Sequence, residues 1–306
     1  MLGVIGDVVQ DVVVWQLEPV QRATDTRSSI VTQRGGSAAN VAALAAPRYR
    51  TRFLGCVGDD AGGHSVRRDL EEHGVDVRVQ VRDRTGVIVV LIDETGERTM
   101  FPSRGASARM RRVDPTWLDG IELLHITAYS FESRATTDAV LAATREIKER
   151  GGRISLDVSS IGTIEHRGVP GFLDLMQRCE PDFISANRDE SLLLDLADGS
   201  TPGAGLKRFP GAVLLARAGT SETNVIQDGE HLLTVPVQPV STARDLTGAG
   251  DAFNAGFLAN YLAEGWDPPR NVEAAHAMSR RVLHNPGCGD AVDERLPKSP
   301  RSEETE

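Results

Sequence analysis

Short apolar runs alternate along this chain with segments of helical periodicity, and this alternation most limits the folds open to it. The apolar runs end in turn signals and predict buried central strands at residues 2–5, 123–127, 153–158, 182–187 and 212–219. Helical patterns lie between them, most clearly at residues 135–151, which end at Gly151, and from Gly62 to Gly74. Strand, helix and strand in succession predict parallel strands with right-handed crossovers. The sequence therefore predicts one α/β domain with a mostly parallel sheet.

Two stretches, residues 12–33 and 77–102, depart from this alternation. Residues 86–101 alternate apolar and polar side chains around a Glu-Thr-Gly turn, which predicts a pair of antiparallel strands. These stretches predict either a small sheet standing off the main body or an edge extension of the main sheet. A second hairpin is predicted at residues 224–235, with its turn at Asp228-Gly229.

Composition narrows the class of protein further. A length of 306 residues with 40% hydrophobic content allows a large core on both faces of a sheet. The net charge of −10 and dispersed basic residues give no reason to expect a nucleic-acid partner. The cysteines lack metal-ligand spacing and predict a reducing compartment, with two core thiols and one loop thiol among Cys56, Cys179 and Cys288. With no secretory signal or membrane-spanning segment in the sequence, we expect a cytoplasmic protein without a membrane partner.

Residues 245–251, with the sequence DLTGAGD, lead directly into an apolar helix that Gly265 is expected to end. Gly248 and Gly250 allow a tight turn, and the first unpaired N–H groups of the helix favour a bound anion. Asp251 would repel a phosphate there unless it accepts the proton of an attacking hydroxyl as a general base. The segment therefore predicts phosphoryl transfer to an alcohol, and the alternative is an ordinary turn in which Asp251 only interacts with the helix dipole.

The segment DLTGAGDAFNAGF, residues 245–257, resembles the carboxyl-terminal signature of the ribokinase-like (PfkB-type) family of carbohydrate and nucleoside kinases. Further motifs follow in the family's order, GVIGDVVQD at 3–11, RGGSAANVA at 34–42, FLGCVGDDAGG at 53–63, SANRDE at 185–190 and RAGTSE at 217–222. Several motifs in register are far more specific than one glycine string. The resemblance implies a three-layer α/β/α domain over residues 1–296, with a small β lid inserted at about 12–33 and 77–102. Residues 297–306 are charged, contain proline and lack periodicity, so we expect them to form a disordered tail.

The resemblance implies an acceptor site built from four residues. Asp11 would hold hydroxyls of the acceptor, Gly35 and Gly36 would let the sugar approach closely, and Asn40 would offer it a donor and an acceptor. From the residues alone, Asp11 is equally a turn residue, and the glycine pair is equally the entry to an alanine-rich helix capped by Ser37.

The resemblance also implies a nucleotide site for ATP with Mg²⁺. Asn187 and Glu190 would order the magnesium water shell and the phosphates, although N-x-x-E is also the pattern of a helix capping box. Gly219 and Thr220 would lie near the β and γ phosphates and the ribose, or simply form a turn after a strand.

The catalytic residues implied are Asp251, as general base, and Gly248, Ala249 and Gly250, whose backbone would stabilise developing charge. Gly248 and Gly250 would also contact ATP. Asp245 and Thr247 would hold a monovalent cation such as K⁺, or only fix the turn by hydrogen bonds. Here the chain departs from the family, because Leu246 replaces a threonine and the Gly287-Cys288-Gly289 loop is atypical.

Other polar residues carry less weight. Arg104 either contacts substrate or phosphate or forms a surface ion pair. The spacing of His64, His125 and His276 suggests no metal site, which favours structural roles for these side chains.

The function expected is ATP-dependent phosphorylation of a hydroxyl of a small sugar or sugar acid, by a homodimer formed through the lid. Ribose, fructose and 2-keto-3-deoxygluconate are all candidate acceptors. A nucleoside kinase is the near alternative, with Trp15 and Phe101 as stacking surfaces for a base. A sugar-binding sensor without catalysis is a second alternative, which the presence of Asp251 disfavours.

Overall fold

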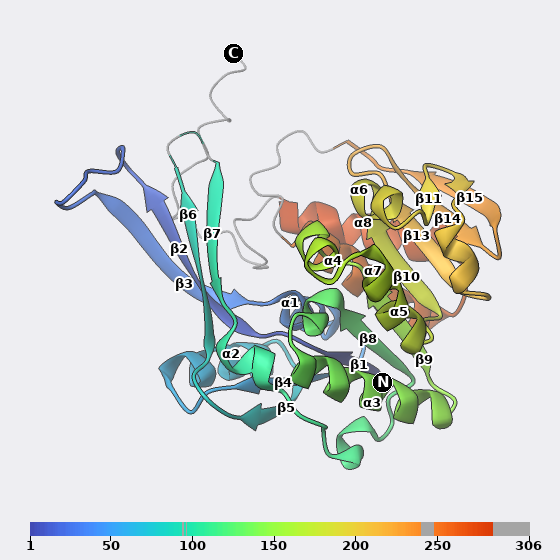
Figure 1. Cartoon of the computed structure of the whole chain (residues 1–306), viewed down its shortest axis with the longest axis horizontal. Helices are drawn as coiled ribbons and strands as arrows, with labels where there is room; N and C mark the ends of the chain where they lie inside the picture. Colours follow the sequence, from blue (N-terminus) through green and yellow to red (C-terminus); the bar gives the residue numbers. More distant parts are fainter. Residues whose placement is uncertain (94, 96, 240–247, 284–306) are drawn as a thin grey trace.

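The computed structural model describes residues 1–93, 95, 97–239 and 248–283. The centre of the fold is a nine-stranded sheet (Figure 1). The strand order is β15-β14-β13-β10-β9-β8-β1-β4-β5. All neighbours from β13 to β5 pair in parallel, whereas β14 and β15 form an antiparallel edge. The bounds are β1 Leu2–Ile5, β4 Thr51–Val57, β5 Asp76–Val81, β8 Leu123–Thr127, β9 Arg153–Asp157, β10 Phe183–Asn187, β13 Val213–Arg217, β14 Glu222–Gln227 and β15 Glu230–Pro236. The expected mostly parallel sheet is confirmed.

Helices cover both faces of this sheet. Side chains alternate across each strand, so Val4 of β1 belongs to one core cluster and Ile5 to the other. One cluster includes α3, α4 and α5, while the other includes α1, α2, α7 and α8. The helix bounds are α1 Ser37–Ala45, α2 Ala61–Glu72, α3 Arg134–Glu149, α4 Ile161–Arg167, α5 Val169–Arg178, α6 Arg188–Leu193, α7 Ala249–Glu264 and α8 Pro268–Leu283. This confirms the three-layer α/β/α arrangement.

A four-stranded sheet projects from the main body as a long arm, which we call the lid (Figure 1). Its order is β3-β2-β6-β7, with bounds β2 Val9–Gln16, β3 Ser28–Gly35, β6 Gly86–Ile92 and β7 Arg98–Ser103. The lid starts at Val9, earlier than expected, so Asp11 lies inside a lid strand. Residues 77–81 were expected in the lid but lie in β5 of the main sheet, where Val77 and Val79 pack on the core beside β4.

The turn residues act as the sequence predicts. Gly151 follows α3 with a φ of 79°, and Gly265 ends α7 with a φ of 88°. The β14–β15 hairpin turns at Asp228 and Gly229, both with positive φ. The shorter elements are β11 Ala197–Asp198, β12 Thr201–Pro202 and 3₁₀ turns at Gly105–Arg109, Pro115–Leu118, Ala128–Phe131 and Gly205–Arg208.

Several expectations fall outside the described residues. These are the tip of the β6–β7 turn at residues 94 and 96, the proposed cation ligands Asp245 and Thr247, Cys288, and the tail at 297–306. The other two cysteines, Cys56 and Cys179, are buried free thiols, as expected. None of the helices in the described ranges has the length and apolar character to cross a membrane.

Close packing of α7 on α8 generates a stability prediction. A Cβ on Gly256 would lie 2.7 Å from the carbonyl oxygen of Ala274 and 2.9 Å from Cα of Ala275. Gly256→Ala should therefore lower the free energy of unfolding by about 1–3 kcal/mol, measured by urea denaturation. Gly171 in α5 is the matched control, because a Cβ on this residue would meet no atom beyond the adjoining helical backbone within 4 Å. Gly171→Ala should raise stability by about 0.5–1 kcal/mol; a loss of similar size in both variants would contradict this account.

Candidate active site

Polar residues gather at the carboxyl edge of the main sheet. Three neighbouring strands, β9, β10 and β13, end in Asp157, Asn187 and Arg217, and Asn187 pairs in register with Arg217. Parallel strands bring their carboxyl ends to one edge, where open α/β sheets bind ligands. The loops and helix ends at this edge therefore form the candidate site.

The amino end of α7 supplies backbone N–H groups that have no partner within the helix. Its N-cap, Gly248, has the left-handed conformation with φ 77° and ψ 0°, and no side chain among the described residues caps the helix there. The first intrahelical hydrogen bond runs from the N–H of Ala252 to the carbonyl of Gly248 at 2.8 Å. The N–H groups of Ala249, Gly250 and Asp251 precede this bond, as expected for an anion-binding helix terminus.

Asp251 is held by two side chains from the amino end of α1. Ser37 donates its hydroxyl to Oδ1 at 2.6 Å, and Asn40 donates its amide to Oδ2 at 2.8 Å. Burial raises the pKa of Asp251 to about 6, against the lowering effect of these two hydrogen bonds. The carboxylate is therefore fixed in position and titrates near neutral pH, which suits a general base.

Asp7, which the sequence analysis did not single out, anchors the start of α1. Its carboxylate accepts from the N–H groups of Ser37 at 3.2 Å and Ala38 at 3.1 Å. The N-cap residue is Gly36, with a φ of 99°, where a Cβ would lie 2.7 Å from the carbonyl oxygen of Asp7. Ser37 is thus not the cap, and its hydroxyl is free to bind Asp251. In the sequence, the position of Asp7 two residues after the first strand was the feature that could have identified it as a site residue.

Asp11 reaches the same site from the lid. Burial, followed by the charge of Asp7, raises its pKa to about 7. Its Oδ1 atom is buried without a hydrogen-bond partner among the described residues. A Cβ on Gly35 would lie 2.1 Å from this oxygen, so glycine is required where the carboxylate packs on β3. An unpaired carboxylate oxygen of this kind suits a ligand hydroxyl.

Two arginines balance part of the negative charge. Arg34 of β3 is almost completely buried and donates to Asp69 and to the amide oxygen of Asn40. Arg104 makes two hydrogen bonds of 2.9 Å to Glu132, and its Nη1 lies 3.7 Å from Asp7 Oδ2. Arg104 therefore forms the ion pair considered as its alternative role, with the partly buried Glu132, and also lies beside Asp7.

Asn187 and Glu190 form a complete capping box at the start of α6. Asn187 Oδ1 accepts from the N–H of Glu190 at 2.9 Å, and Glu190 Oε2 accepts from the N–H of Asn187 at 2.8 Å. Burial and the charge of Asp157 raise the pKa of Glu190 to about 7. The structural role considered for this motif is thus present, at the edge of the candidate site.

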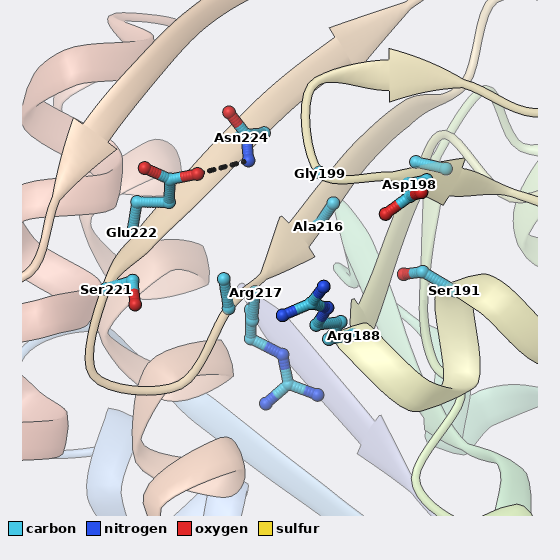
Figure 2. A pocket seen from close by; sticks show the side chains of 11 residues that line it. Arg188, Ser191, Asp198, Gly199, Ala216, Arg217, Ser221, Glu222 and Asn224 are labelled. Atoms are coloured by element: carbon cyan, nitrogen blue, oxygen red, sulfur yellow. Dashed lines mark hydrogen bonds between the residues drawn. The ribbon is translucent and has the colours of Figure 1, made fainter.

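A pocket of about 350 Å³ lies beside this edge (Figure 2). Its walls come from α6, the β11–β12 turn, the end of β13 and the start of β14, and include Arg188, Arg217, Glu222 and Asn224. Gly219 and Thr220 do not line it but lie exposed in the turn between β13 and β14. Arg217 lines this pocket and also packs against the backbone of Gly250 in the first turn of α7.

His125 and His276 have structural surroundings, as expected, whereas His64 is exposed on α2 and contacts the carbonyl oxygen of Asp60. His125 contacts Ser155 Oγ at 3.0 Å, and His276 contacts Thr223 Oγ1 at 2.9 Å. Burial lowers the pKa of both to about 4, so both are neutral near pH 7. Within the described ranges, no three histidine, cysteine or acidic side chains are arranged to hold a metal directly.

Known relatives of the chain are kinases. A fructokinase of Klebsiella pneumoniae is 30% identical over 275 residues, which cover 86% of this chain and 85% of that protein. An ATP-dependent ribose-1-phosphate kinase of Halopiger xanaduensis is 31% identical over 279 residues, or 87% of each protein. Both alignments span nearly the whole domain.

Solved structures share the fold. An adenosine kinase from Sinorhizobium meliloti superposes with a TM-score of 0.79 at 22% identity, covering 94% of each chain. An Escherichia coli protein assigned as a ribokinase II was solved in complex with ATP and Mg²⁺. It superposes with a TM-score of 0.80 at 23% identity, covering 94% of each chain. The family model described as pfkB family carbohydrate kinase matches residues 1–295, and the chain therefore belongs to this family of phosphotransferases that act on a hydroxyl group.

Proposed function

We propose that this kinase transfers the γ-phosphoryl group of ATP to a hydroxyl of a small sugar or sugar acid, with Asp251 as general base. The acceptor oxygen forms a bond to the γ-phosphorus, and the bond from that phosphorus to the bridging oxygen breaks. The electron pair of the broken bond leaves with ADP, and the hydroxyl proton passes to the Asp251 carboxylate. The N–H groups of Ala249, Gly250 and Asp251 stabilise the charge that develops on the transferred group.

The position of Asp251 carries this proposal. Its carboxylate lies at the start of α7 and is oriented by Ser37 and Asn40. One residue thus places a proton acceptor beside a set of unpaired N–H donors. A base for the hydroxyl and donors for the phosphoryl group are the two components that such a transfer requires.

Of the two acceptor classes proposed, the charge of the acceptor side favours an uncharged sugar over a sugar acid. Asp7, Asp11 and Asp251 influence one another electrostatically, and the guanidinium groups of Arg34 and Arg104 are already bonded to other side chains. An acceptor that carries a phosphate or carboxylate would meet this acidic cluster without a cation reserved for it. A neutral sugar would instead donate a hydroxyl to the unpaired Oδ1 of Asp11.

The nucleotide is proposed to lie along the carboxyl edge of the sheet, near Asn187, Gly219, Thr220 and the α7 start, with Glu190 on the magnesium water shell. The buried carboxylate of Glu190 fits this role, because Mg²⁺ keeps several waters and is often held through acidic side chains. When bound, Mg²⁺ would neutralise charge on the phosphate oxygens. A monovalent cation at Asp245 and Thr247 remains part of the proposal.

For a nucleoside acceptor, the lid register separates the two aromatic candidates. Trp15 lies four residues from Asp11 on the same strand and hence on the same face of the lid. Phe101 pairs with Val89, which pairs with Val12, and so lies on the opposite face. Trp15 is therefore the aromatic side chain available to stack on a nucleoside base. Phe101 faces away from Asp11, so its position on the lid needs another explanation.

That opposite face supports a homodimer formed through the lid. Pairing in register places Phe101, Val89, Val12, Val14, Leu91 and Ile30 on one side of the four strands. Phe101 is 56% exposed and Ile30 is 60% exposed, although both are large and apolar. Apolar side chains gathered on one sheet face are typical of a surface buried between subunits.

ADP release with Mg·ATP against a panel of acceptors tests the proposed function. The panel contains fructose, ribose, 2-keto-3-deoxygluconate, ribose-1-phosphate, adenosine and inosine. We expect turnover with a neutral sugar, and a rate about 10²- to 10⁴-fold lower in Asp251→Asn, which should still bind nucleotide. Near-normal turnover of this variant would refute the base, whereas binding of a sugar without ADP release by the wild type would indicate a sensor.

The pH dependence gives a second test of Asp251. Because a protonated carboxyl cannot accept the hydroxyl proton, the rate should fall as the pH drops below about 6. Ser37→Ala removes a hydrogen bond to the ionised form, so the acid limb should move to higher pH. Asp11→Asn removes one of the two other carboxyls with a raised pKa, the second being Glu190, and because it also removes a negative charge near Asp251 it should leave the limb in place or move it slightly to lower pH. A limb unchanged by Ser37→Ala but absent in Asp11→Asn would assign the titration to Asp11.

The dimer is tested by sedimentation. Phe101→Glu places a charge on the apolar lid face and should produce monomers, because an unpaired charge is costly to bury. Met100 is 50% exposed but points to the other face, so Met100→Glu is the matched control and should leave the dimer intact. A monomeric wild type, or equal effects of both substitutions, would remove the lid from the interface.

A further inference from the structure

We propose that Arg217 is a further catalytic residue whose guanidinium group binds the phosphoryl group in transfer, an assignment that rests on the proposed phosphoryl-transfer function. In the sequence, Arg217 is the first residue of the RAGTSE motif. Its surroundings in the folded chain give it this role.

Arg217 lies between the pocket and the start of α7. It is the last residue of β13 and lines the 350 Å³ pocket, and in Figure 2 its side chain extends past the strand end, away from Asn224. On its other side, Nη1 lies 2.6 Å from the position that a Cβ on Gly250 would take. The guanidinium therefore packs directly on the backbone that carries the anion-binding N–H groups. A phosphate chain running from the pocket toward Asp251 would pass this group.

The guanidinium is oriented but not saturated. Nη2 donates to Asp157 Oδ1 at 3.0 Å, and Glu190 Oε2 lies 3.9 Å from the same nitrogen, too far for a hydrogen bond. The face of the group lies over the Phe253 ring at 5.6 Å. Nε is buried without a partner among the described residues. Within the described residues, one of the five N–H donors is hydrogen-bonded and Nε is buried, which leaves the remaining donors of Nη1 and Nη2 for phosphate oxygens, which a planar guanidinium binds in pairs.

A purely structural ion pair accounts for these contacts less well. Asp157 and Glu190 are both buried, and Arg217 provides the positive charge between them. However, buried ion pairs add little net stability, and one that served only the fold would be expected to satisfy its donors. Nη1 instead lies against the Gly250 backbone at the start of α7, where the proposed phosphate chain would run, and this position suits an arginine that stabilises phosphoryl transfer.

The test compares Arg217→Ala and Arg217→Lys with the wild type by kinetics and by nucleotide binding. We expect kcat to fall about 10²- to 10³-fold in both, with the acceptor KM nearly unchanged, because the lost contact forms with the transferred group. Binding of adenylyl imidodiphosphate should weaken about tenfold, as expected for loss of a charge-assisted hydrogen bond, while ADP binding should hardly change. Guanidinium ion at non-denaturing millimolar concentrations should restore part of the Arg217→Ala activity.

Two controls separate this role from a structural one. Arg208→Ala removes a half-buried arginine that pairs with Asp174 on α5, away from the site, and should leave kcat unchanged. Thermal unfolding identifies variants that remain folded, and Arg217→Lys keeps the positive charge beside Asp157. A folded variant with wild-type kcat, or equal weakening of both nucleotides, would overturn the assignment. If the wild type turns over no acceptor, the proposed function fails, and the comparison of the two nucleotides still decides the role of Arg217.

Discussion

The hydrogen bonds from Ser37 and Asn40 to Asp251 join the amino ends of α1 and α7, and the site depends on this junction. Both helices lie on the same face of the main sheet, where their apolar sides share one core cluster. Asp7, which follows β1, binds the first N–H groups of α1 and so fixes that helix to the sheet. The position of Asp251, the base that we propose, is therefore set by the packing of two core helices, as precise proton transfer would require.

The acidic residues at this junction favour function over stability. Burial and mutual repulsion raise the pKa of Asp251 to about 6 and of Asp11 to about 7, so their ionised forms are less favourable in the folded protein than in the unfolded chain. Stability from the protonated groups is present below their unfolded pKa of about 4 and is lost as the pH rises through these folded values. Near neutral pH the fold tolerates this cost, as expected if the proposed roles of these carboxylates, binding an acceptor hydroxyl and accepting its proton, require them there.

Sequence reasoning reached the elements that local patterns encode. Apolar periodicity and glycine stops predicted the central strands and the ends of α3 and α7, and the motif at residues 248–251 predicted the uncapped helix start. It did not find Asp7 or Arg217, because their roles arise from contacts with residues far along the chain. The assignment of β5 to the main sheet was missed for a related reason, since alternation alone does not determine which strand a segment joins.

The lid is connected to Asp251 by a chain of hydrogen bonds. Arg34 lies on lid strand β3 and donates to the amide oxygen of Asn40, while the amide nitrogen of Asn40 donates to Asp251. This fixes the orientation of the amide, because only one of its two ends can accept from an arginine. The same strand carries Gly35, against which Asp11 packs. A displacement of β3 would therefore alter the positions of both Asp11 and Asp251. Under the roles that we propose for them, the position of the lid and the geometry for proton transfer are coupled through this one strand.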